Sequence, residues 1–173
     1  MSSLKHFKHI STFVFDIDGV LTDGTIYVFD DGEQARRMNI KDGYALQLAV
    51  KKGYTVIAIS GANSEAARTR LNRLGIEHVF LQVGNKKKKL EEFLKEKKLS
   101  WEDILFMGDD IPDLELMKQA GLSCAPADAA PSVRQVAKYI SSYKGGEGCV
   151  RDVIEKVMKL RGDWQLDTEI PSK

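Results

Sequence analysis

The stretch FVFDIDGVLTDG, residues 13–24, begins like a buried strand and then places three acids within eight positions: Asp16, Asp18 and Asp23. Carboxylates this close together repel one another, and each is costly to remove from water without a partner. A chain that leaves a hydrophobic strand through such a cluster needs a compensating charge nearby. The pattern therefore predicts a positive charge at the end of this strand.

The composition is that of an ordinary globular domain. A chain of 173 residues is long enough for one domain with a full core, and 43% hydrophobic with 29% charged residues argue against disorder. The 26 basic and 25 acidic residues leave a net charge of +1, which gives no general attraction for nucleic acid or a membrane surface. We therefore expect neither as a partner.

Neither the N-terminus nor the cysteines indicate export. The segment MSSLKHFKHI is polar, unlike a secretory signal, and no apolar run approaches the roughly 20 residues that span a bilayer. Cys124 and Cys149 form no CxxC motif and are read as free thiols in a reducing compartment. These features predict a cytoplasmic protein.

Short apolar runs alternate with stretches of helical spacing. The runs are residues 13–15, 55–60, 78–81, 104–107 and 123–125, and the helical stretches are 44–53, 64–75, 86–98 and 113–121. This alternation predicts an α/β fold with a Rossmann-like, doubly wound and mainly parallel sheet. We expect one domain over residues 1–161 and a flexible tail over residues 162–173, because the tail lacks periodicity.

One segment interrupts the alternation. Residues 25–40 contain two extended runs around the turn signal DDG, which predicts a β-hairpin between the first strand and the first helix.

Polar groups follow three of the predicted strands. The first strand is followed by Asp16 and Asp18, the second by Ser60 and Gly61, and the fourth by Asp109, Asp110 and Asp113, while Lys86 opens a helix after the third. Ligands of open parallel sheets bind beyond the carboxyl ends of the strands. Several acids gathered there would repel one another unless a hard cation such as Mg²⁺, commonly shared with a phosphate, lay among them. The pattern thus predicts a magnesium site that binds a phosphoryl group.

Each motif alone also has a purely structural interpretation. An Asp can cap a helix or a turn, and the acids of residues 108–113 could cap a helix that begins near Pro112. Three such motifs in this chain order, each after a separate strand, favour a functional site over three unrelated caps.

The motifs resemble those of the haloacid dehalogenase superfamily of phosphatases. FDIDGVLTD (15–23), ISG (59–61), Lys86 and GDDIPD (108–113) are similar to the four motifs of that superfamily. Three further stretches, 38–46, 59–76 and 144–153, resemble one branch, the 3-deoxy-D-manno-octulosonate 8-phosphate phosphatases. The resemblance implies hydrolysis of that sugar phosphate to the sugar acid KDO and phosphate, in lipopolysaccharide sugar biosynthesis.

The resemblance also implies a role for each site residue. Asp16 would be the nucleophile that forms an aspartyl phosphate, and Asp18 the general acid and base. Asp16, the backbone carbonyl of Asp18 and Asp109 would bind Mg²⁺, with Asp110 in the outer shell. Ser60 and Gly61 would hydrogen-bond the phosphoryl oxygens, while Lys86, rather than Lys87, would neutralise the transition state.

Substrate contacts are implied for a further set of residues: Asp42, Arg70, Arg73 and Asp113, with Arg68 and Arg151 as additional candidates. Arginine suits a sugar carboxylate because it can bind it through two hydrogen bonds. Many octulosonate phosphatases have an arginine where this chain has Ala62. Ala62 therefore leaves open a nonulosonate 9-phosphate or broad-range sugar phosphatase.

The segments between the motifs are too short to contain a cap domain. The resemblance implies a homotetramer in which hairpins pack together and a neighbour closes each site, burying Ile26, Tyr27, Val28 and Phe29. The alternative is a hairpin folded onto its own subunit.

Two non-enzymatic readings also remain. A receiver domain of a response regulator uses similar residues, but its phospho-acceptor ends the third strand, where this chain has no Asp. An assembly partner with a decayed site is the other, although every residue type needed for catalysis is present.

Overall fold

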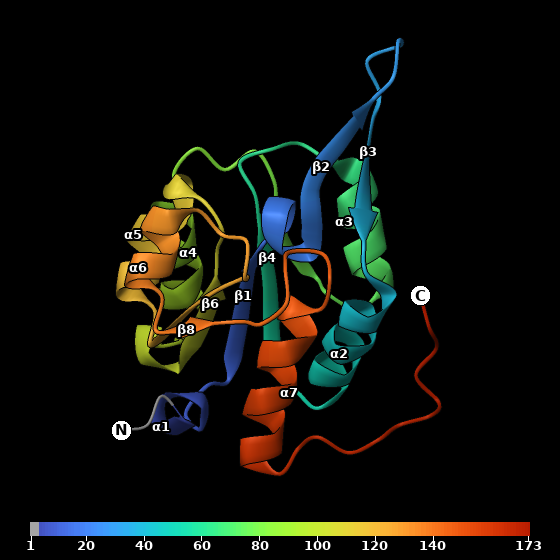
Figure 1. The fold of residues 1–173 in the computed structure, drawn as a ribbon. Helices are drawn as coiled ribbons and strands as arrows, with labels where there is room; N and C mark the ends of the chain where they lie inside the picture. Colours follow the sequence, from blue (N-terminus) through green and yellow to red (C-terminus); the bar gives the residue numbers. More distant parts are fainter. Residues whose placement is uncertain (1–3) are drawn as a thin grey trace.

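A six-stranded parallel sheet forms the centre of the computed structural model, which describes residues 4–173 (Figure 1). The strands are β1 (Thr12–Asp16), β4 (Thr55–Ile59), β5 (His78–Phe80), β6 (Ile104–Met107), β7 (Leu122–Ala125) and β8 (Tyr139–Ile140). Their order is β5-β4-β1-β6-β7-β8, and every neighbouring pair is parallel. The predicted doubly wound α/β fold is confirmed.

Helices cover both faces of the sheet. One face carries α1 (Leu4–Phe7), α2 (Ile40–Lys51), α3 (Glu65–Arg73) and α7 (Cys149–Arg161), and the other carries α4 (Lys86–Lys97), α5 (Leu114–Gln119) and α6 (Pro131–Val136). The chain also contains three short helical segments, η1 (Ile17–Leu21), η2 (Trp101–Asp103) and η3 (Ile111–Asp113). None of the helices described is both long and apolar enough to cross a membrane.

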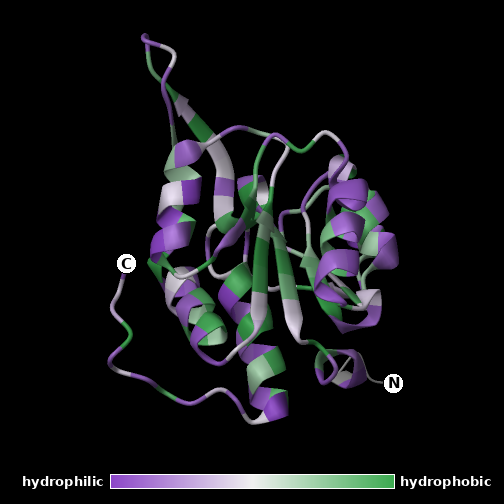
Figure 2. Cartoon of the chain, turned by 180° about the vertical axis from the view of Figure 1, so that it is seen from behind, coloured by the Kyte–Doolittle hydropathy of each residue, from purple (hydrophilic) through white to green (hydrophobic). Residues whose placement is uncertain are grey.

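The central strand β1 supplies side chains to both halves of the core. Phe13 and Phe15 pack under α2 and α7, whereas Val14 faces the α4 and α5 side. Strand side chains alternate between faces, so a continuously hydrophobic strand is expected where both faces are covered. The strands accordingly form a hydrophobic centre between helices whose outer faces are polar (Figure 2).

The strand order places a topological switch at β1. From β1 the chain continues to β4 and β5 on one side, and then returns to β6, β7 and β8 on the other. Connections leave neighbouring strands in opposite directions there, which opens a crevice at their carboxyl ends. Asp16 is the last residue of β1, and Asp109 follows β6 after Gly108.

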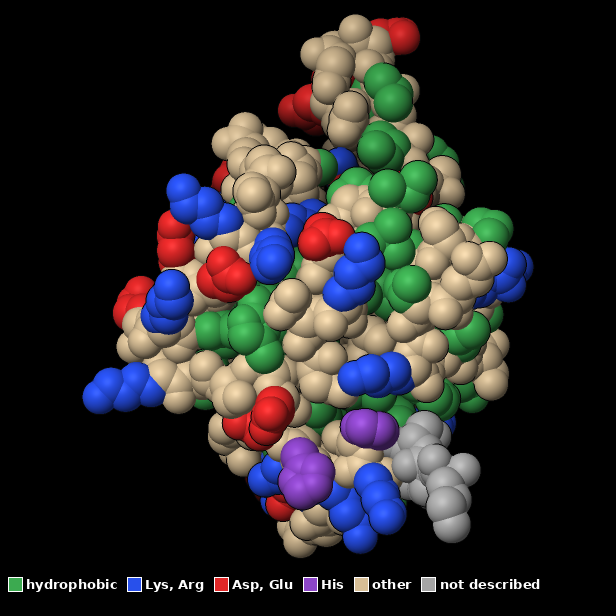
Figure 3. Space-filling model, turned by 90° about the vertical axis from the view of Figure 1, so that its left-hand side faces the viewer, with side chains coloured by type: hydrophobic (Ala, Val, Ile, Leu, Met, Phe, Trp, Pro, Cys, Tyr) green, Lys and Arg blue, Asp and Glu red, His purple; other side chains and the backbone are tan. Residues whose placement is uncertain are grey.

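The expected hairpin is present. Strands β2 (Thr22–Val28) and β3 (Gln34–Met38) form an antiparallel ribbon that projects above the sheet (Figure 1). Hydrophobic side chains are visible along it (Figure 3), and Ile26, Tyr27, Val28 and Phe29 are 41–70% exposed. Between β4 and α4 the chain forms only α3 and β5 as regular elements, so the described residues contain no cap domain.

Three elements lie beyond the last predicted strand. They are α6, the two-residue strand β8, and α7, which packs against α2. The loop before α7 packs closely against the loop after β1. A Cβ added at Gly145 would lie 1.9 Å from the carbonyl oxygen of Gly19. A glycine is required at that contact, and it helps to fix the loop that follows Asp16.

Residues 162–173, predicted as a flexible tail, contact α2 and the hydrophobic core. The hydroxyl of Tyr44 on α2 donates to the carbonyl of Asp167 at 3.0 Å, and Trp164 and Ile170 pack against the core. The segment has no periodicity because it docks as an extended chain through scattered side chains.

Candidate active site

Asp16 lies at the end of β1 and is buried. The chain then turns through η1, where Gly19 has a φ of +86°. A Cβ at Gly19 would lie 1.9 Å from Oδ2 of Asp109, so only glycine allows this loop to approach the loop after β6 so closely. The glycine of the DIDG motif therefore brings two carboxylates from separate strands together.

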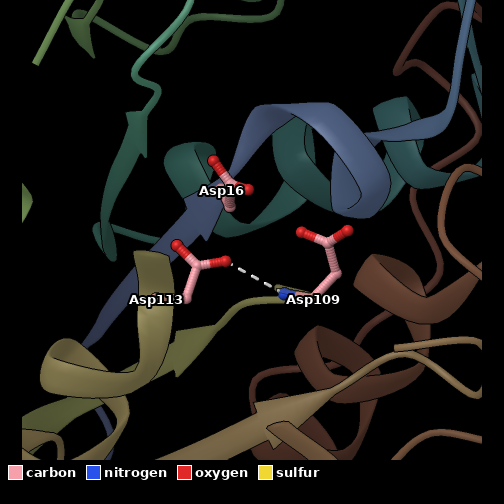
Figure 4. A group of neighbouring side chains, drawn as sticks. All are labelled: Asp16, Asp109 and Asp113. Atoms are coloured by element: carbon pink, nitrogen blue, oxygen red, sulfur yellow. Dashed lines mark hydrogen bonds between the residues drawn. The ribbon is translucent and has the colours of Figure 1, made fainter. Parts of the chain in front are cut away.

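The loop after β6 is organised by Asp113. Its Oδ2 accepts the backbone N–H groups of Asp109 at 3.0 Å and Asp110 at 3.4 Å, while the side chain of Asp110 accepts the N–H of Ile111 at 2.8 Å. The structural interpretation of these acids as caps thus holds for Asp110 and Asp113. Asp109 remains directed toward Asp16 (Figure 4).

Lys86 is the lysine of the run 86–89 whose ammonium group enters the site. Asn85 begins α4 by accepting the N–H of Lys88, and Nζ of Lys86 lies 2.9 Å from Oδ1 of Asp16 and 2.8 Å from Oδ1 of Asp113. Burial alone would lower the pKa of Lys86, but these two carboxylates outweigh it and raise the pKa. The ammonium is therefore firmly charged and supplies part of the predicted positive charge.

Ser60 and Gly61 complete the pocket at the end of β4. Ser60 is buried, and its Oγ accepts the N–H of Ala62 at 3.0 Å, which leaves the hydroxyl proton to donate elsewhere. Gly61 is exposed.

The carboxylates of this site still repel one another, because the single charge of Lys86 does not neutralise them all. Burial raises the pKa of Asp16, and the charge of Asp113 raises it further; burial likewise raises the pKa of Asp109. Oxygens of Asp16, Asp109 and Asp113 lie within 4.8 Å of one another, around a common space (Figure 4). Because Asp113 is already bound to Lys86 and two amides, Asp16 and Asp109 are the pair that a divalent cation would relieve. The residues fit a magnesium ion.

The structure brings most of the sequence-predicted residues to one open pocket of about 290 Å³. Its lining includes Asp16, Asp18, Ser60, Gly61, Lys86, Asp109, Asp110 and Asp113. They come from loops after β1, β4 and β6 and from the start of α4, as the strand-end pattern predicts.

One residue that contacts the lining of this pocket, without lining it itself, was missed by the sequence reasoning. Arg36 on β3 donates from Nε to Oδ1 of Asp18 at 2.7 Å, and its side chain is only 7% exposed. No spacing motif marks it, since an arginine in a polar hairpin strand is ordinarily solvated. The sequence signal that could have pointed to Arg36 is that its hairpin follows soon after the DIDG segment, residues 16–19.

Asp42 does not reach the pocket. It is buried beneath the start of α7, where its Oδ1 accepts the N–H of Arg151 at 2.8 Å. Burial raises its pKa to about 6 despite this bond, and its Oδ2 has no hydrogen-bond partner among the described residues. Within this subunit Asp42 joins α2 to α7.

The candidate arginines also lie outside the pocket of Asp16. Arg70 lines a separate groove between β3 and α3, where its Nη2 donates to the carbonyl of Lys173 at 2.8 Å, and Arg73 is exposed nearby. Arg68 donates to the carbonyl of Val79. The guanidinium of Arg151 lies over the rings of Tyr44 and Trp164 on the α2–α7 side.

Comparison of the sequence with known proteins identifies similar enzymes. Residues 78–154 match the family described as haloacid dehalogenase-like hydrolase. The 3-deoxy-D-manno-octulosonate 8-phosphate phosphatase of Escherichia coli strain K12 is 33% identical over 155 residues, covering 90% of this chain and 82% of that protein. The phosphatase of the same name from Yersinia pestis is 34% identical over 158 residues, covering 89% and 84%.

Solved structures give the same result. The crystal structure of the Yersinia pestis phosphatase superposes with a TM-score of 0.91 at 32% identity, covering 93% of this chain and 87% of that chain. The Moraxella catarrhalis phosphatase, in complex with magnesium ion, phosphate ion and KDO, superposes with a TM-score of 0.90 at 30% identity, covering 93% and 92%. The likeness in sequence and fold extends over most of both chains.

Proposed function

Because the chain belongs to the 3-deoxy-D-manno-octulosonate 8-phosphate phosphatase family of haloacid dehalogenase-like hydrolases, we propose that its pocket hydrolyses this phosphomonoester to KDO and phosphate. The chain is a phosphatase, and Mg²⁺ is its cofactor. The observation that carries the proposal is the meeting of Asp16, Lys86 and Asp109 at the switch point of the sheet. A nucleophile, a fixed cation and a metal-binding carboxylate are the groups that phosphoryl transfer requires.

Asp16 is the proposed nucleophile. One of its oxygens attacks phosphorus, the bond between phosphorus and the sugar oxygen breaks, and an aspartyl phosphate forms. The hydrogen bond from Lys86 to Oδ1 fixes the carboxylate, so the attacking group is held in one orientation before substrate binds.

Asp18 is the proposed general acid and base. As the ester bond breaks, Asp18 gives its proton to the leaving sugar oxygen. A water molecule then attacks the phosphorus of the aspartyl phosphate, Asp18 takes a proton from that water, and the bond to Asp16 breaks to regenerate the free enzyme. The side chain of Asp18 is 30% exposed, which gives water access to it.

Lys86, Ser60 and Gly61 are proposed to hold the phosphoryl oxygens. The charged ammonium of Lys86 faces the pocket with Asp113 behind it, and the Ser60 hydroxyl and the Gly61 amide are available as donors. These groups stabilise the charge that develops on the equatorial oxygens in the transition state. Asp113 contributes by orienting Lys86 and the loop of residues 109–110.

Asp16, Asp109 and the backbone carbonyl of Asp18 would hold the magnesium ion, with Asp110 in the outer shell. When bound, the ion supplies Lewis-acid polarisation of the phosphoryl oxygens and neutralises the clustered carboxylates.

The sugar acid is proposed to be recognised with the help of a second subunit. The Asp16 pocket is open, Arg70 lies in a different groove, and Arg36 is already bound to Asp18, so a neighbouring subunit would supply the arginine for the sugar carboxylate. A homotetramer, assembled through the exposed hairpin residues, would close each site and bring a neighbour's Arg70 or Arg73 to the substrate. We further propose that this reaction belongs to lipopolysaccharide sugar biosynthesis and takes place in the cytoplasm.

Ala62 supports a second candidate substrate. It lines the Asp16 pocket, where many octulosonate phosphatases have an arginine. A smaller residue there leaves room for a longer sugar acid, such as a nonulosonate 9-phosphate.

Phosphate release from octulosonate 8-phosphate, nonulosonate 9-phosphate and hexose 6-phosphate tests the proposal. We expect kcat/KM with the eight-carbon substrate to exceed that with the hexose phosphate by about 100-fold, because a bound carboxylate adds charge-assisted hydrogen bonds. A higher value for the nine-carbon acid would assign the second function. Equal values for all three would remove sugar-acid specificity.

A further inference from the structure

Two neighbouring arginines of the hairpin bind two acids of the segment that follows β1. Nε of Arg36 donates to Oδ1 of Asp18 at 2.7 Å, and Nε of Arg37 donates to Oδ2 of Asp23 at 2.8 Å. Side chains alternate along a strand, so the two arginines leave β3 on opposite faces and bind different parts of the segment.

The two ion pairs differ in burial and in place. The side chain of Arg36 is 7% exposed, whereas that of Arg37 is 59% exposed. An exposed pair is screened by water and fixes little, but a buried guanidinium holds its carboxylate through a short, directional bond. Asp18 lines the Asp16 pocket, and Asp23 does not.

We propose that Arg36 is a positioning residue, which holds the Asp18 carboxylate in the orientation that proton transfer requires. The inference rests on the proposed acid and base role of Asp18. Arg36 donates to Oδ1, which leaves Oδ2 as the oxygen that gives and takes the proton. In the first step, Oδ2 gives the proton to the ester oxygen as that oxygen leaves phosphorus. In the second step, Oδ2 takes a proton from water as the water oxygen bonds to phosphorus and the bond from phosphorus to Asp16 breaks.

The hairpin register sets the position of Arg36. Arg36 lies opposite Ile26 in the β2–β3 ribbon, and the guanidinium spans from the groove between β3 and α3 to the carboxylate in the Asp16 pocket. The projecting ribbon is thereby connected to the proton-transfer step. A change in the conformation of the hairpin would therefore alter proton transfer by Asp18 through the hydrogen bond from Arg36.

Leaving-group dependence tests this role. A sugar alkoxide leaves poorly without a proton, whereas p-nitrophenolate leaves without help, so the ratio of kcat/KM for octulosonate 8-phosphate to that for p-nitrophenyl phosphate reports the acid step. We expect Arg36→Gln to lower this ratio by about tenfold or more, a part of the 10²–10⁴-fold that general acids contribute. Arg36→Lys, which keeps the charge but not the fork geometry, should recover part of the loss.

Arg37→Gln is the matched control, because it removes the neighbouring arginine pair and leaves Asp18 untouched; we expect its ratio to stay within about twofold of wild type. Adding Arg36→Gln to Asp18→Asn should lower the ratio no further. The ratio is independent of the fraction of enzyme that is active, so partial misfolding does not hide the result. A normal ratio in Arg36→Gln would overturn the inference. A normal ratio in Asp18→Asn would instead remove the proposed role of Asp18, and the inference with it.

Discussion

The ammonium of Lys86 lies 2.9 Å from Oδ1 of Asp16, a contact that joins residues 70 positions apart. Asp16 ends the central strand and Lys86 begins a helix on one face of the sheet, so the contact exists only when both are in place. It places a fixed cation beside Asp16, while the carboxylate of Asp109 lies nearby and burial raises the pKa of both acids. The single ammonium therefore faces several clustered carboxylates, and the site still requires a further cation.

Asp16→Asn tests the nucleophile. An amide cannot attack phosphorus, so we expect phosphate release to fall by about 10³-fold or more, as for removal of a catalytic nucleophile. The fold should be kept, because the change removes a buried carboxylate whose pKa is raised by burial. Thermal unfolding in EDTA should give a midpoint at or above that of wild type. Turnover within tenfold of wild type would contradict the assignment.

Magnesium should stabilise the protein as well as activate it. The ion binds only the folded site, so it raises the free energy of unfolding by about 2.7 kcal/mol at a hundredfold excess over its Kd. We expect Asp109→Asn to lose this gain together with activity. Asp18→Asn is the control, since it keeps the backbone carbonyl; it should lose turnover and retain the shift in unfolding midpoint. A magnesium-induced shift in Asp109→Asn equal to that of wild type would remove Asp109 from the metal site.

Asp42 predicts a pH dependence of stability. Its pKa is about 6 in the folded protein against roughly 3.9 in an unfolded chain, so the folded state binds the proton more tightly between these values. This stabilisation is complete below about pH 4 and is lost as the pH rises through 6. Asp42→Asn can still accept the N–H of Arg151, and we expect it to be about 2 kcal/mol more stable than wild type at pH 7.5.

The measurement is urea unfolding of both proteins at pH 7.5 and pH 4.5, where the difference should shrink. The other carboxyl groups with raised pKa values are present in both proteins, so their contributions to the free energy of unfolding cancel in the comparison. Asp167→Asn serves as the control, because the ion pair with Lys51 lowers the pKa of Asp167 and cannot give a difference of this sign. A difference that is constant between the two pH values would show that the ionisation of Asp42 is not its cause.

The sequence predicts the fold and the pocket because both follow from local patterns. Apolar strands that end in acids, a hydroxyl or a glycine need only a parallel sheet to meet at one edge. The contacts of Asp42 and Arg36 do not follow in this way. Asp42 accepts from Arg151, 109 positions later, and Arg36 reaches back 18 positions to Asp18. Periodicity reports which face of an element is buried, but it does not report which polar partner lies there.

The hairpin provides the last prediction, which concerns assembly. Tyr27 is 59% and Val28 is 70% exposed, on successive positions of β2, so the ribbon offers apolar side chains on both faces. Exposed apolar residues on a segment that projects from the body mark a protein interface. We expect the combined changes Tyr27→Lys and Val28→Lys to dissociate the proposed homotetramer, because they would bury two charges in its interface. Ile26 is left unchanged, since it lies opposite Arg36.

Light scattering should show the mass of this variant falling toward the 19.4 kDa of one chain. With the neighbour lost, kcat/KM for the sugar phosphate should fall by about tenfold or more, because remote contacts to the sugar contribute to transition-state binding. Activity toward p-nitrophenyl phosphate, which has no sugar to bind, should fall less. Val136→Lys, an exposed apolar position on α6 far from the hairpin in sequence, should leave mass and activity as in wild type. A wild-type protein that is fully active as a monomer would contradict this prediction, and the open pocket would then act without a neighbour.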